Sequence, residues 1–189
     1  MKLLMVAASL RRGSYNKKLI RLVASLARDS GASVDLAEFT EFPVPMYNAD
    51  DEEASGIPEG AQAFARRLND ATGMVISSPE YNNAMPGTLK NLIDWVSRIR
   101  PLPFTGKHAL LLSASPSLVG GNRGLWALRV PLEALGVLVY PTMFSLAQAN
   151  KAFTENDSLQ DPRLTERLGR TVKAYFHMAQ AIDTANSSS

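Results

Sequence analysis

The stretch PEYNNAMPGTLKNLIDW, residues 79–95, decides the fold. It follows a short apolar run, residues 74–76, which is typical of a buried strand. The helical pattern begins after the second proline, and its apolar face consists of Leu89, Leu92, Ile93 and Val96. A strand, a polar loop and an amphipathic helix in this order form one β-α unit. In open α/β sheets, ligands bind beside the carboxyl ends of such strands.

The same alternation recurs along the chain. Apolar runs predict strands at residues 3–8, 33–37, 74–76, 108–113 and 137–140. Amphipathic patterns predict helices at residues 17–28, at 58–71, around Trp95, up to about Leu135 and at 163–182. Pro131 predicts a kink or a restart in the fourth helix, and residues 39–60 are expected to be irregular. Five β-α repeats predict an α/β three-layer sandwich, with a five-stranded parallel sheet in the flavodoxin-like order 2-1-3-4-5 and helices on both faces.

Length and composition indicate a single globular unit. The chain has 189 residues, 46% of them hydrophobic and 20% charged, which supports one domain with a substantial core. We expect this domain to cover residues 1–183 and the remaining tail, residues 184–189, to be frayed.

Charge and residue usage exclude several classes of protein. A formal charge of +2 gives no strong field that would attract nucleic acid. The absence of cysteine removes disulfides, thiolate catalysis and sulfur-ligated metals, and neither histidine has a partner at ligand spacing, so no metal site is expected. No signal peptide and no membrane-length apolar stretch is visible, so we expect a cytoplasmic protein without membrane insertion.

The first β-α loop, SLRRGSYN at residues 9–16, has the composition of an anion site. It precedes a helix, whose free N–H groups and positive dipole end favour phosphate. Its neutral donors are Ser9, Ser14 and Asn16, and its cations are Arg11 and Arg12. The alternative is that Ser14 or Asn16 only caps the helix and the arginines are solvated. Neither GxxxxGK[ST] nor GxGxxG is present, which favours a mononucleotide over a dinucleotide.

Two further loops are expected at the same sheet edge. In the first, two prolines stiffen the segment that carries Glu80, Tyr81, Asn82 and Asn83, which we interpret as a platform for a planar heterocycle. The alternative is that the asparagines only satisfy turns. The second loop, residues 113–121, supplies serine hydroxyls and a Gly-Gly pair, a pattern that is also common in ordinary loops.

These motifs together resemble the NADPH-dependent FMN reductase family of flavodoxin-like proteins. SLRRGSYN is similar to the family's S-x-R-x-x-S-x-N phosphate loop, and residues 79–95 resemble its PEYN-x-x-x-PG-x-LKN-x-IDW signature. The resemblance implies phosphate contacts at Ser9, Arg11, Ser14, Tyr15 and Asn16. It implies flavin-ring contacts at Pro79, Glu80, Tyr81, Asn82, Ala114 and Ser115, and Asn83 is the candidate substrate residue.

The resemblance also implies an activity. It is that of an NAD(P)H-dependent oxidoreductase that passes hydride from NADPH or NADH through bound FMN to quinone, chromate, azo or similar small-molecule acceptors. No catalytic side chain is then required, because the flavin carries the chemistry. Family members form homodimers or homotetramers, and Leu125, Trp126 and the connector at residues 98–104 are candidate contacts. Two alternatives stay open: a flavodoxin-type electron carrier, or an interaction module that kept only the fold.

Overall fold

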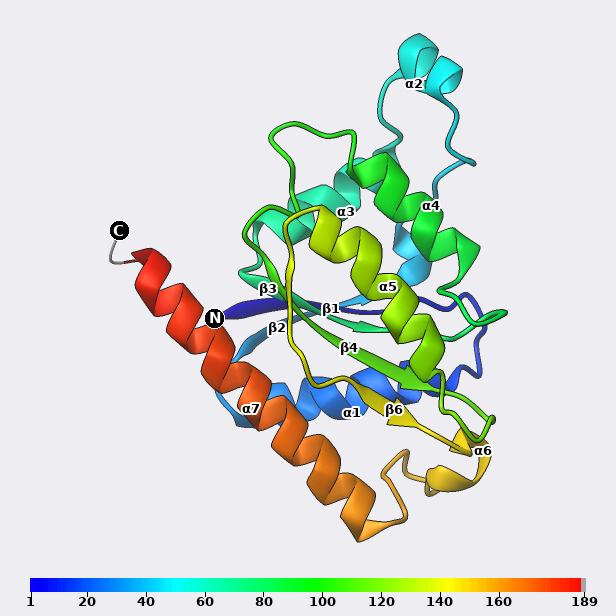
Figure 1. The fold of residues 1–189 in the computed structure, drawn as a ribbon, viewed down its shortest axis with the longest axis vertical. Helices are drawn as coiled ribbons and strands as arrows, with labels where there is room; N and C mark the ends of the chain where they lie inside the picture. Colours follow the sequence, from blue (N-terminus) through cyan, green and yellow to red (C-terminus); the bar gives the residue numbers. More distant parts are fainter. Residues whose placement is uncertain (188–189) are drawn as a thin grey trace.

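The fold is a parallel sheet between two layers of helices (Figure 1). The computed structural model describes residues 1–187. The strands are β1 (Lys2–Ala7), β2 (Ser33–Glu38), β3 (Gly73–Ser77), β4 (His108–Ala114), β5 (Leu138–Val139) and β6 (Phe144–Leu146). Their order is β2-β1-β3-β4-β5, and every pairing is parallel, as the sequence predicts. The addition is β6, which pairs with the carboxyl end of β4, while β5 is shorter than expected.

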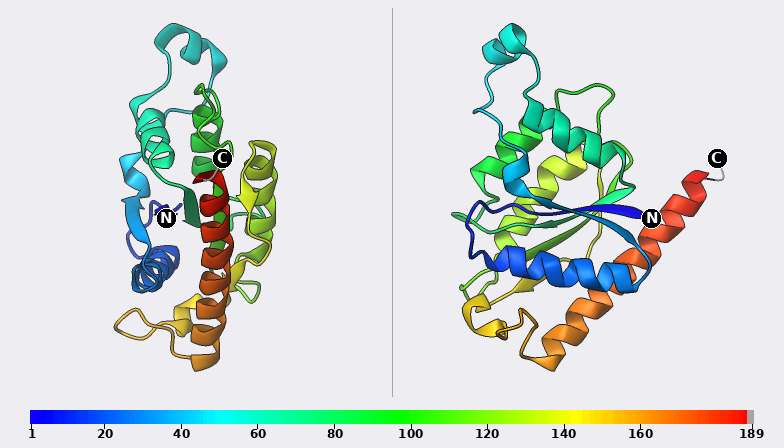
Figure 2. Two further views of the ribbon diagram at one scale, coloured as in Figure 1. Left: turned by 90° about the vertical axis from the view of Figure 1, so that its left-hand side faces the viewer. Right: turned by 180° about the vertical axis from the view of Figure 1, so that it is seen from behind.

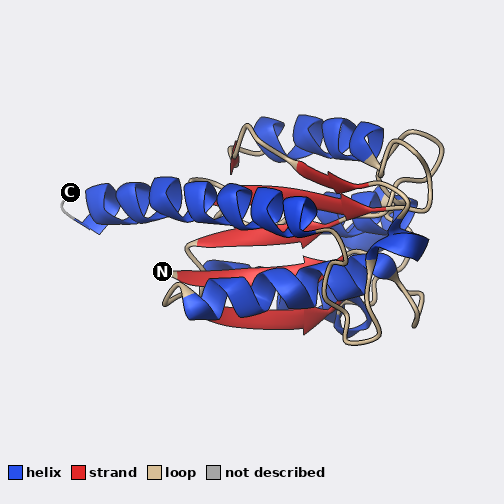
Figure 3. Cartoon of the chain, turned by 90° about the horizontal axis from the view of Figure 1, so that it is seen from below, coloured by secondary structure: helices blue, strands red, loops and turns tan. Residues whose placement is uncertain are grey.

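The helices divide between the two faces of the sheet (Figures 2 and 3). On one face lie α1 (Tyr15–Asp29) and α7 (Pro162–Ser187). The other face carries α3 (Glu59–Asn69), α4 (Gly87–Val96) and α5 (Asn122–Ala134). Along each central strand the side chains alternate between the two cores: Leu3 and Met5 face α1, whereas Leu4 and Val6 face α3 and α4.

Several local expectations need correction. The stretch expected to be irregular contains a 3-10 turn, η1 (Phe39–Glu41), and a helix, α2 (Ala49–Ser55). A further short helix, α6 (Ala149–Ala152), lies in the final loop. α5 continues across Pro131, so the expected restart is wrong, while the expected kink stays a prediction. α7 extends to Ser187, so most of the tail expected to fray is helical, and residues 188–189 lie outside the described part.

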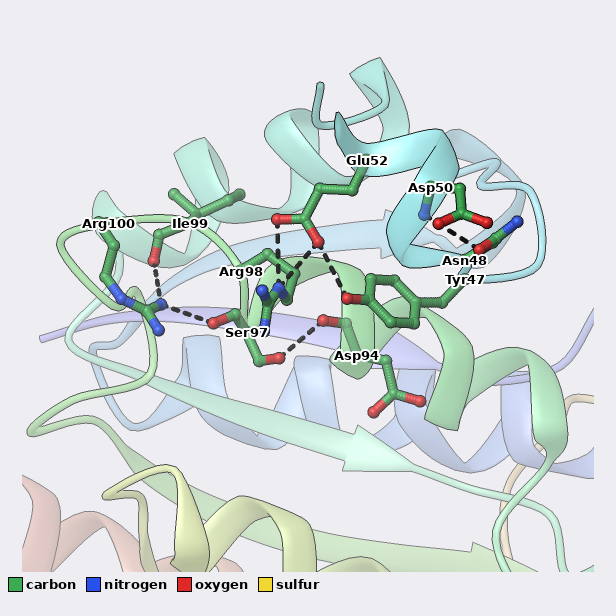
Figure 4. A network of polar contacts seen from close by, with 9 residues as sticks. All are labelled: Tyr47, Asn48, Asp50, Glu52, Asp94, Ser97, Arg98, Ile99 and Arg100. Atoms are coloured by element: carbon green, nitrogen blue, oxygen red, sulfur yellow. Dashed lines mark hydrogen bonds and ion pairs between the residues drawn. The ribbon is translucent and has the colours of Figure 1, made fainter. Parts of the chain in front are cut away.

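The helix α2 projects away from the sheet (Figures 1 and 2). None of its residues, all of which are described, is buried. Its base is held by polar contacts: the Tyr47 hydroxyl donates to the Glu52 carboxylate at 2.9 Å, and the Arg98 guanidinium donates to the same carboxylate at 2.9 Å (Figure 4). Trp95 anchors the segment to α4, since its indole N–H donates to the Pro45 carbonyl.

At the amino-terminal end of β4, a buried histidine packs against β3. His108 is fully buried, and its Nδ1 lies 2.8 Å from the hydroxyl of Tyr175 on α7. That hydroxyl also donates to the Met74 carbonyl at 3.2 Å, and burial holds the pKa of Tyr175 well above its usual value. Gly73 faces the ring: a methyl group there would lie 2.2 Å from the imidazole atoms. The glycine therefore makes room for the histidine.

Candidate functional site

Three loops meet at the carboxyl edge of the sheet, because β1, β3 and β4 are neighbours and end in register. They surround a hollow of about 140 Å³, which we call the cofactor hollow. Its lining residues are Ser9, Arg11, Ser14, Tyr15, Asn16, Pro79, Glu80, Tyr81, Ala114, Ser115 and Pro116. Every cofactor contact predicted from the sequence is in this set except Asn82, and Pro116 is added to it.

The amino terminus of α1 opens onto the cofactor hollow with its donors available. Ser14 is the N-cap residue, and its carbonyl accepts the N–H groups of Lys17 and Lys18. The N–H groups of the first two helical residues, Tyr15 and Asn16, precede these bonds and belong to the set that a helix leaves unpaired. The Ser14 side chain makes no capping bond within the described chain. The alternative that Ser14 serves only as a cap is therefore not supported.

The charge around this helix end is positive. The first turn of α1, all of it described, has no acidic residue to compensate the dipole. The two lysines of that turn are paired elsewhere, Lys17 with Glu38 at 2.7 Å and Lys18 with Asp157 at 2.5 Å. Arg11 lines the cofactor hollow and forms no ion pair with a carboxylate of the described residues. Its guanidinium is therefore the cation that remains for a bound anion.

Asn16, which the resemblance implies as a phosphate contact, has a side chain that bonds within the fold. It is 3% exposed, and its amide group donates to the Ala114 carbonyl and accepts the Ala114 N–H, both at 3.0 Å. Its oxygen also accepts the Ser77 hydroxyl at 2.9 Å. The side chain thus joins α1 to the ends of β3 and β4. Of its polar groups, the backbone N–H is the one left to face an anion.

The side chain of Glu80 also forms a hydrogen bond within the fold. Its carboxylate accepts the Gly124 N–H at 2.8 Å and so caps the amino terminus of α5 from another loop. Gly124 permits this approach, because a methyl group there would lie 3.1 Å from the Glu80 Cα. The capping bond ties the β3–α4 loop to α5. The backbone of Glu80, rather than its carboxylate, is left for a ligand.

The two asparagines form a tight turn at the tip of the β3–α4 loop. Tyr81 and Ala84 exchange backbone hydrogen bonds of 2.9 and 3.0 Å. Between them, Asn82 and Asn83 have φ of 52° and 64°, which is the pattern of a type I′ hairpin turn. Asn83 also accepts a hydrogen bond from Arg123 at 3.2 Å. The alternative that these residues satisfy a turn therefore describes Asn82 well, while the exposed Tyr81 lines the cofactor hollow.

The β4–α5 loop is held from behind by β6. The Ser115 N–H donates to the Leu146 carbonyl, and Gly120, with φ of 68°, packs so closely on Ala147 that a methyl group would lie 2.7 Å from its nitrogen. This explains Gly120 of the Gly-Gly pair, for which the sequence left an ordinary loop as one alternative. Sequence reasoning also missed Ser77 and Gly124. Gly124 leaves one visible signal, a glycine inside a helical pattern, which often marks a close approach.

No cluster of acidic or histidine side chains among the described residues is arranged to hold a metal ion. Within residues 1–187, none of the helices combines the length and apolarity that a membrane span requires.

Comparison with known proteins agrees with this geometry. The chain is 35% identical over 175 residues to an NAD(P)H-dependent FMN reductase of Pseudomonas aeruginosa, covering 92% of both chains. It is 32% identical over 176 residues to a quinone reductase of Escherichia coli, covering 92% of this chain and 93% of that one.

Structural similarity gives the same assignment. FerB, a flavoenzyme NAD(P)H:acceptor oxidoreductase from Paracoccus denitrificans, superposes with a TM-score of 0.81 at 25% identity, covering 97% of each chain. Flavodoxin 1 of Bacillus cereus shares the fold, with a TM-score of 0.60 at 14% identity, covering 94% of this chain and 98% of that one. The sequence profile described as NADPH-dependent FMN reductase matches residues 1–151. The chain therefore belongs to the NADPH-dependent FMN reductase family.

Proposed function

We propose that this protein is an NAD(P)H-dependent FMN and quinone reductase whose FMN binds in the cofactor hollow. One observation carries the assignment of the site: the uncompensated amino terminus of α1 and the unpaired Arg11 open onto the same hollow. A phosphate group matches both features. The relatives named above are reductases of this kind, which supports the activity.

The residues present fit FMN in two parts. Ser9, Ser14 and Arg11, with the N–H groups that begin α1, form the donor set for the phosphate. The hollow is smaller than the roughly 300 Å³ at the lower end of ligand pockets, so it encloses only part of a mononucleotide. Pro79 and the exposed ring of Tyr81 provide a flat surface for the remainder.

The chain's own residues bind and orient rather than react. When bound, FMN accepts a hydride from a nicotinamide and passes the electrons to an acceptor. The stiff backbone of the β3–α4 loop, held by Glu80 on α5, presents N–H groups in fixed positions, which favours the binding of developing negative charge. We propose Asn83, which lies at the hairpin tip beside Arg123, as a residue that contacts the acceptor.

We further infer that the protein forms a homodimer or homotetramer. Trp126 and Val130, one turn apart on α5, are 57% and 70% exposed and form an apolar stripe that suits a subunit contact. The earlier candidate Leu125 is not part of it, because Leu125 is fully buried. In the connector, Phe104 is likewise buried, so it belongs to the core.

The electron-carrier alternative has less support. Carriers of this type dock on basic partners and are strongly acidic, whereas this chain carries a net charge of +2. The likeness to flavodoxin, at 14% identity, concerns the fold alone.

An anaerobic absorption spectrum tests the proposal. Purified protein saturated with FMN should show flavin bands that bleach when NADPH or NADH is added, and oxidised quinone should restore them. Bands that resist both nucleotides would refute the reductase assignment and favour the carrier. Protein that never takes up FMN would refute the cofactor site as well.

A further inference from the structure

A second hollow lies beside the cofactor hollow, on the β2 side of the β1–α1 loop. We call it the Leu10 hollow; its volume is about 300 Å³. Its lining residues are Leu10, Phe39, Thr40, Phe42, Pro43, Val44, Thr88 and Asn91. Leu10 stands between Ser9 and Arg11, which both line the cofactor hollow, so one short loop separates the two spaces. Thr88, in the first turn of α4, follows the loop that carries Tyr81.

The residues that line the Leu10 hollow disfavour a charged ligand. None of the lining residues is ionisable, and five of the eight are apolar: Leu10, Phe39, Phe42, Pro43 and Val44. Asn91 is the strongest polar group in the set, but both ends of its amide are used. Its oxygen accepts the Tyr47 N–H at 2.8 Å and its nitrogen donates to the Pro45 carbonyl at 2.7 Å. An apolar ligand portion is therefore favoured over an anion or a polyol.

The rim of the site is apolar too. Leu10 and Tyr81 are each 55% exposed, and Leu118 on the third loop is 81% exposed. Single exposed apolar side chains are ordinary. Here, however, each of the three loops that surround the cofactor hollow presents one at the same sheet edge, so an apolar molecule that reaches the cofactor meets these side chains first.

We propose that the Leu10 hollow binds the hydrocarbon substituent of the electron acceptor, while the reducible ring of the acceptor lies at the cofactor hollow. The acceptor is then an uncharged quinone with an alkyl or prenyl chain, and small anionic acceptors gain nothing from this subsite. This inference rests on the proposed reductase function for the identity of the acceptor. The hollow itself is built from this chain alone, so its occupancy can be measured without FMN.

The test compares two redox-inactive ligands, a quinol dimethyl ether with a decyl chain and the same ring without the chain. Their affinities are measured by equilibrium titration of FMN-free protein and of FMN-loaded protein. We expect the chain to raise the affinity by about tenfold or more in both forms, since burial of each methylene contributes roughly a fourfold factor.

Three variants locate the effect. Leu10→Glu should abolish the preference for the chain, because it places a charge at the apolar wall. Leu10→Met should retain it. Leu138→Glu is the matched control, since it puts the same charge on a leucine that is 54% exposed and lies outside the lining sets of both hollows, and it should also retain the preference. Both leucines are exposed, so the variants should fold, which thermal melts would verify.

Several outcomes would overturn the inference: no preference for the chain in the native protein, an equal loss in Leu10→Glu and Leu138→Glu, or a Leu10→Glu protein that changes its oligomeric state in sedimentation. The last result would mean that a second copy covers the Leu10 hollow. All of them leave the proposed function intact, because that function is read from FMN uptake and the bleaching of its bands.

Discussion

The side chains of Ser14 and Asn16, at the start of α1, differ in what they contact, although the motif places both residues at the phosphate. The Ser14 hydroxyl has no capping partner in the described chain, whereas the Asn16 amide joins three elements. Ser14→Ala should therefore weaken FMN binding and leave the FMN-free protein within about 0.5 kcal/mol of the original stability. Asn16→Ala should cost about 2–4 kcal/mol of unfolding free energy, because it leaves buried partners unsatisfied.

Urea unfolding of the FMN-free proteins, together with fluorescence titration of FMN, separates these two effects. A destabilised Ser14→Ala protein would mean that the hydroxyl supports the helix after all. An Asn16→Ala protein of unchanged stability would contradict the joining role.

The adjacent arginines provide another matched pair. Arg11 lines the cofactor hollow and Arg12 does not. Arg11→Ala should lower FMN affinity by about tenfold to a hundredfold, the range expected for a charge-assisted hydrogen bond, and Arg12→Ala should leave it within about twofold. Equilibrium dialysis of FMN measures both constants. Equal losses in the two variants would show that only the local field matters, and not a contact by Arg11.

At the residue scale, the sequence predicted which side chains gather and not what each one does. Asn16 and Glu80 both line the cofactor hollow, but a motif records positions without hydrogen-bond partners, so it does not show that their side chains bond within the fold. Their partners, Ala114 and Gly124, lie far away in the chain, so only the folded structure brings them together. The turn at Asn82 and Asn83 could have been predicted, since asparagine tolerates the positive φ that both central residues of a type I′ turn require.

At the scale of elements, the bond from Glu80 to Gly124 sets how the β3–α4 loop sits on α5. Glu80→Ala should remove the cap and loosen the loop, with a loss of about 1 kcal/mol in stability and a fall in FMN affinity. Glu80→Gln keeps an oxygen that can accept the N–H and should recover most of both. Hydrogen exchange at the first turn of α5 gives a direct reading, and faster exchange is expected in Glu80→Ala alone. Identical exchange rates in the Glu80→Ala and Glu80→Gln proteins would rule out that the bond from Glu80 to Gly124 holds the loop on α5.

A second link joins β2 to α3 and depends on pH. Arg67 binds the Asp35 carboxylate, and this hydrogen bond and charge hold the pKa of Asp35 below its usual value. A carboxyl group whose pKa is lower in the folded protein than in the unfolded chain stabilises the fold at pH values above the unfolded pKa, which is about 3.9. This stabilisation is lost as the pH falls through the folded pKa. Asp35→Asn should be less stable by about 1 kcal/mol at neutral pH, and the gap should close below about pH 4.

Urea midpoints at a series of pH values would follow that gap. Glu53→Gln, on the exposed α2, is the control and should show no such closing. A gap that stays constant to acid pH would exclude the Asp35 pair as its source.

Elements with strong periodicity were predicted well, and short ones were not. Leu89, Leu92, Ile93 and Val96 are buried as the pattern required. β6 is only three residues long, and it is a strand because β4 offers it an edge. α2 buries nothing, so no apolar pattern could announce it; its acidic first turn and the Asn48 cap were the available signals.

At the scale of the whole molecule, the strand order followed from the sequence because right-handed crossovers leave few alternatives. The subunit contact did not follow from the sequence, since an exposed apolar stripe on a helix and a buried one have the same period.

If Trp126 and Val130 form a subunit contact, the double variant Trp126→Asp, Val130→Asp should shift the protein toward monomers in sedimentation equilibrium. Leu118→Glu should have no such effect. A double variant that sediments like the original would exclude α5 as the contact.

The packing of Gly73 against His108 also constrains how this sequence can change. A methyl group at position 73 would lie 2.2 Å from the imidazole, so alanine is excluded there while the histidine remains. The same methyl group would lie 2.8 Å from the backbone carbonyl oxygen of residue 108, and no substitution at that position removes this contact. The glycine is therefore required by the main chain as well as by the imidazole. Descendants of this chain should keep glycine at position 73 even where the histidine at position 108 has been replaced.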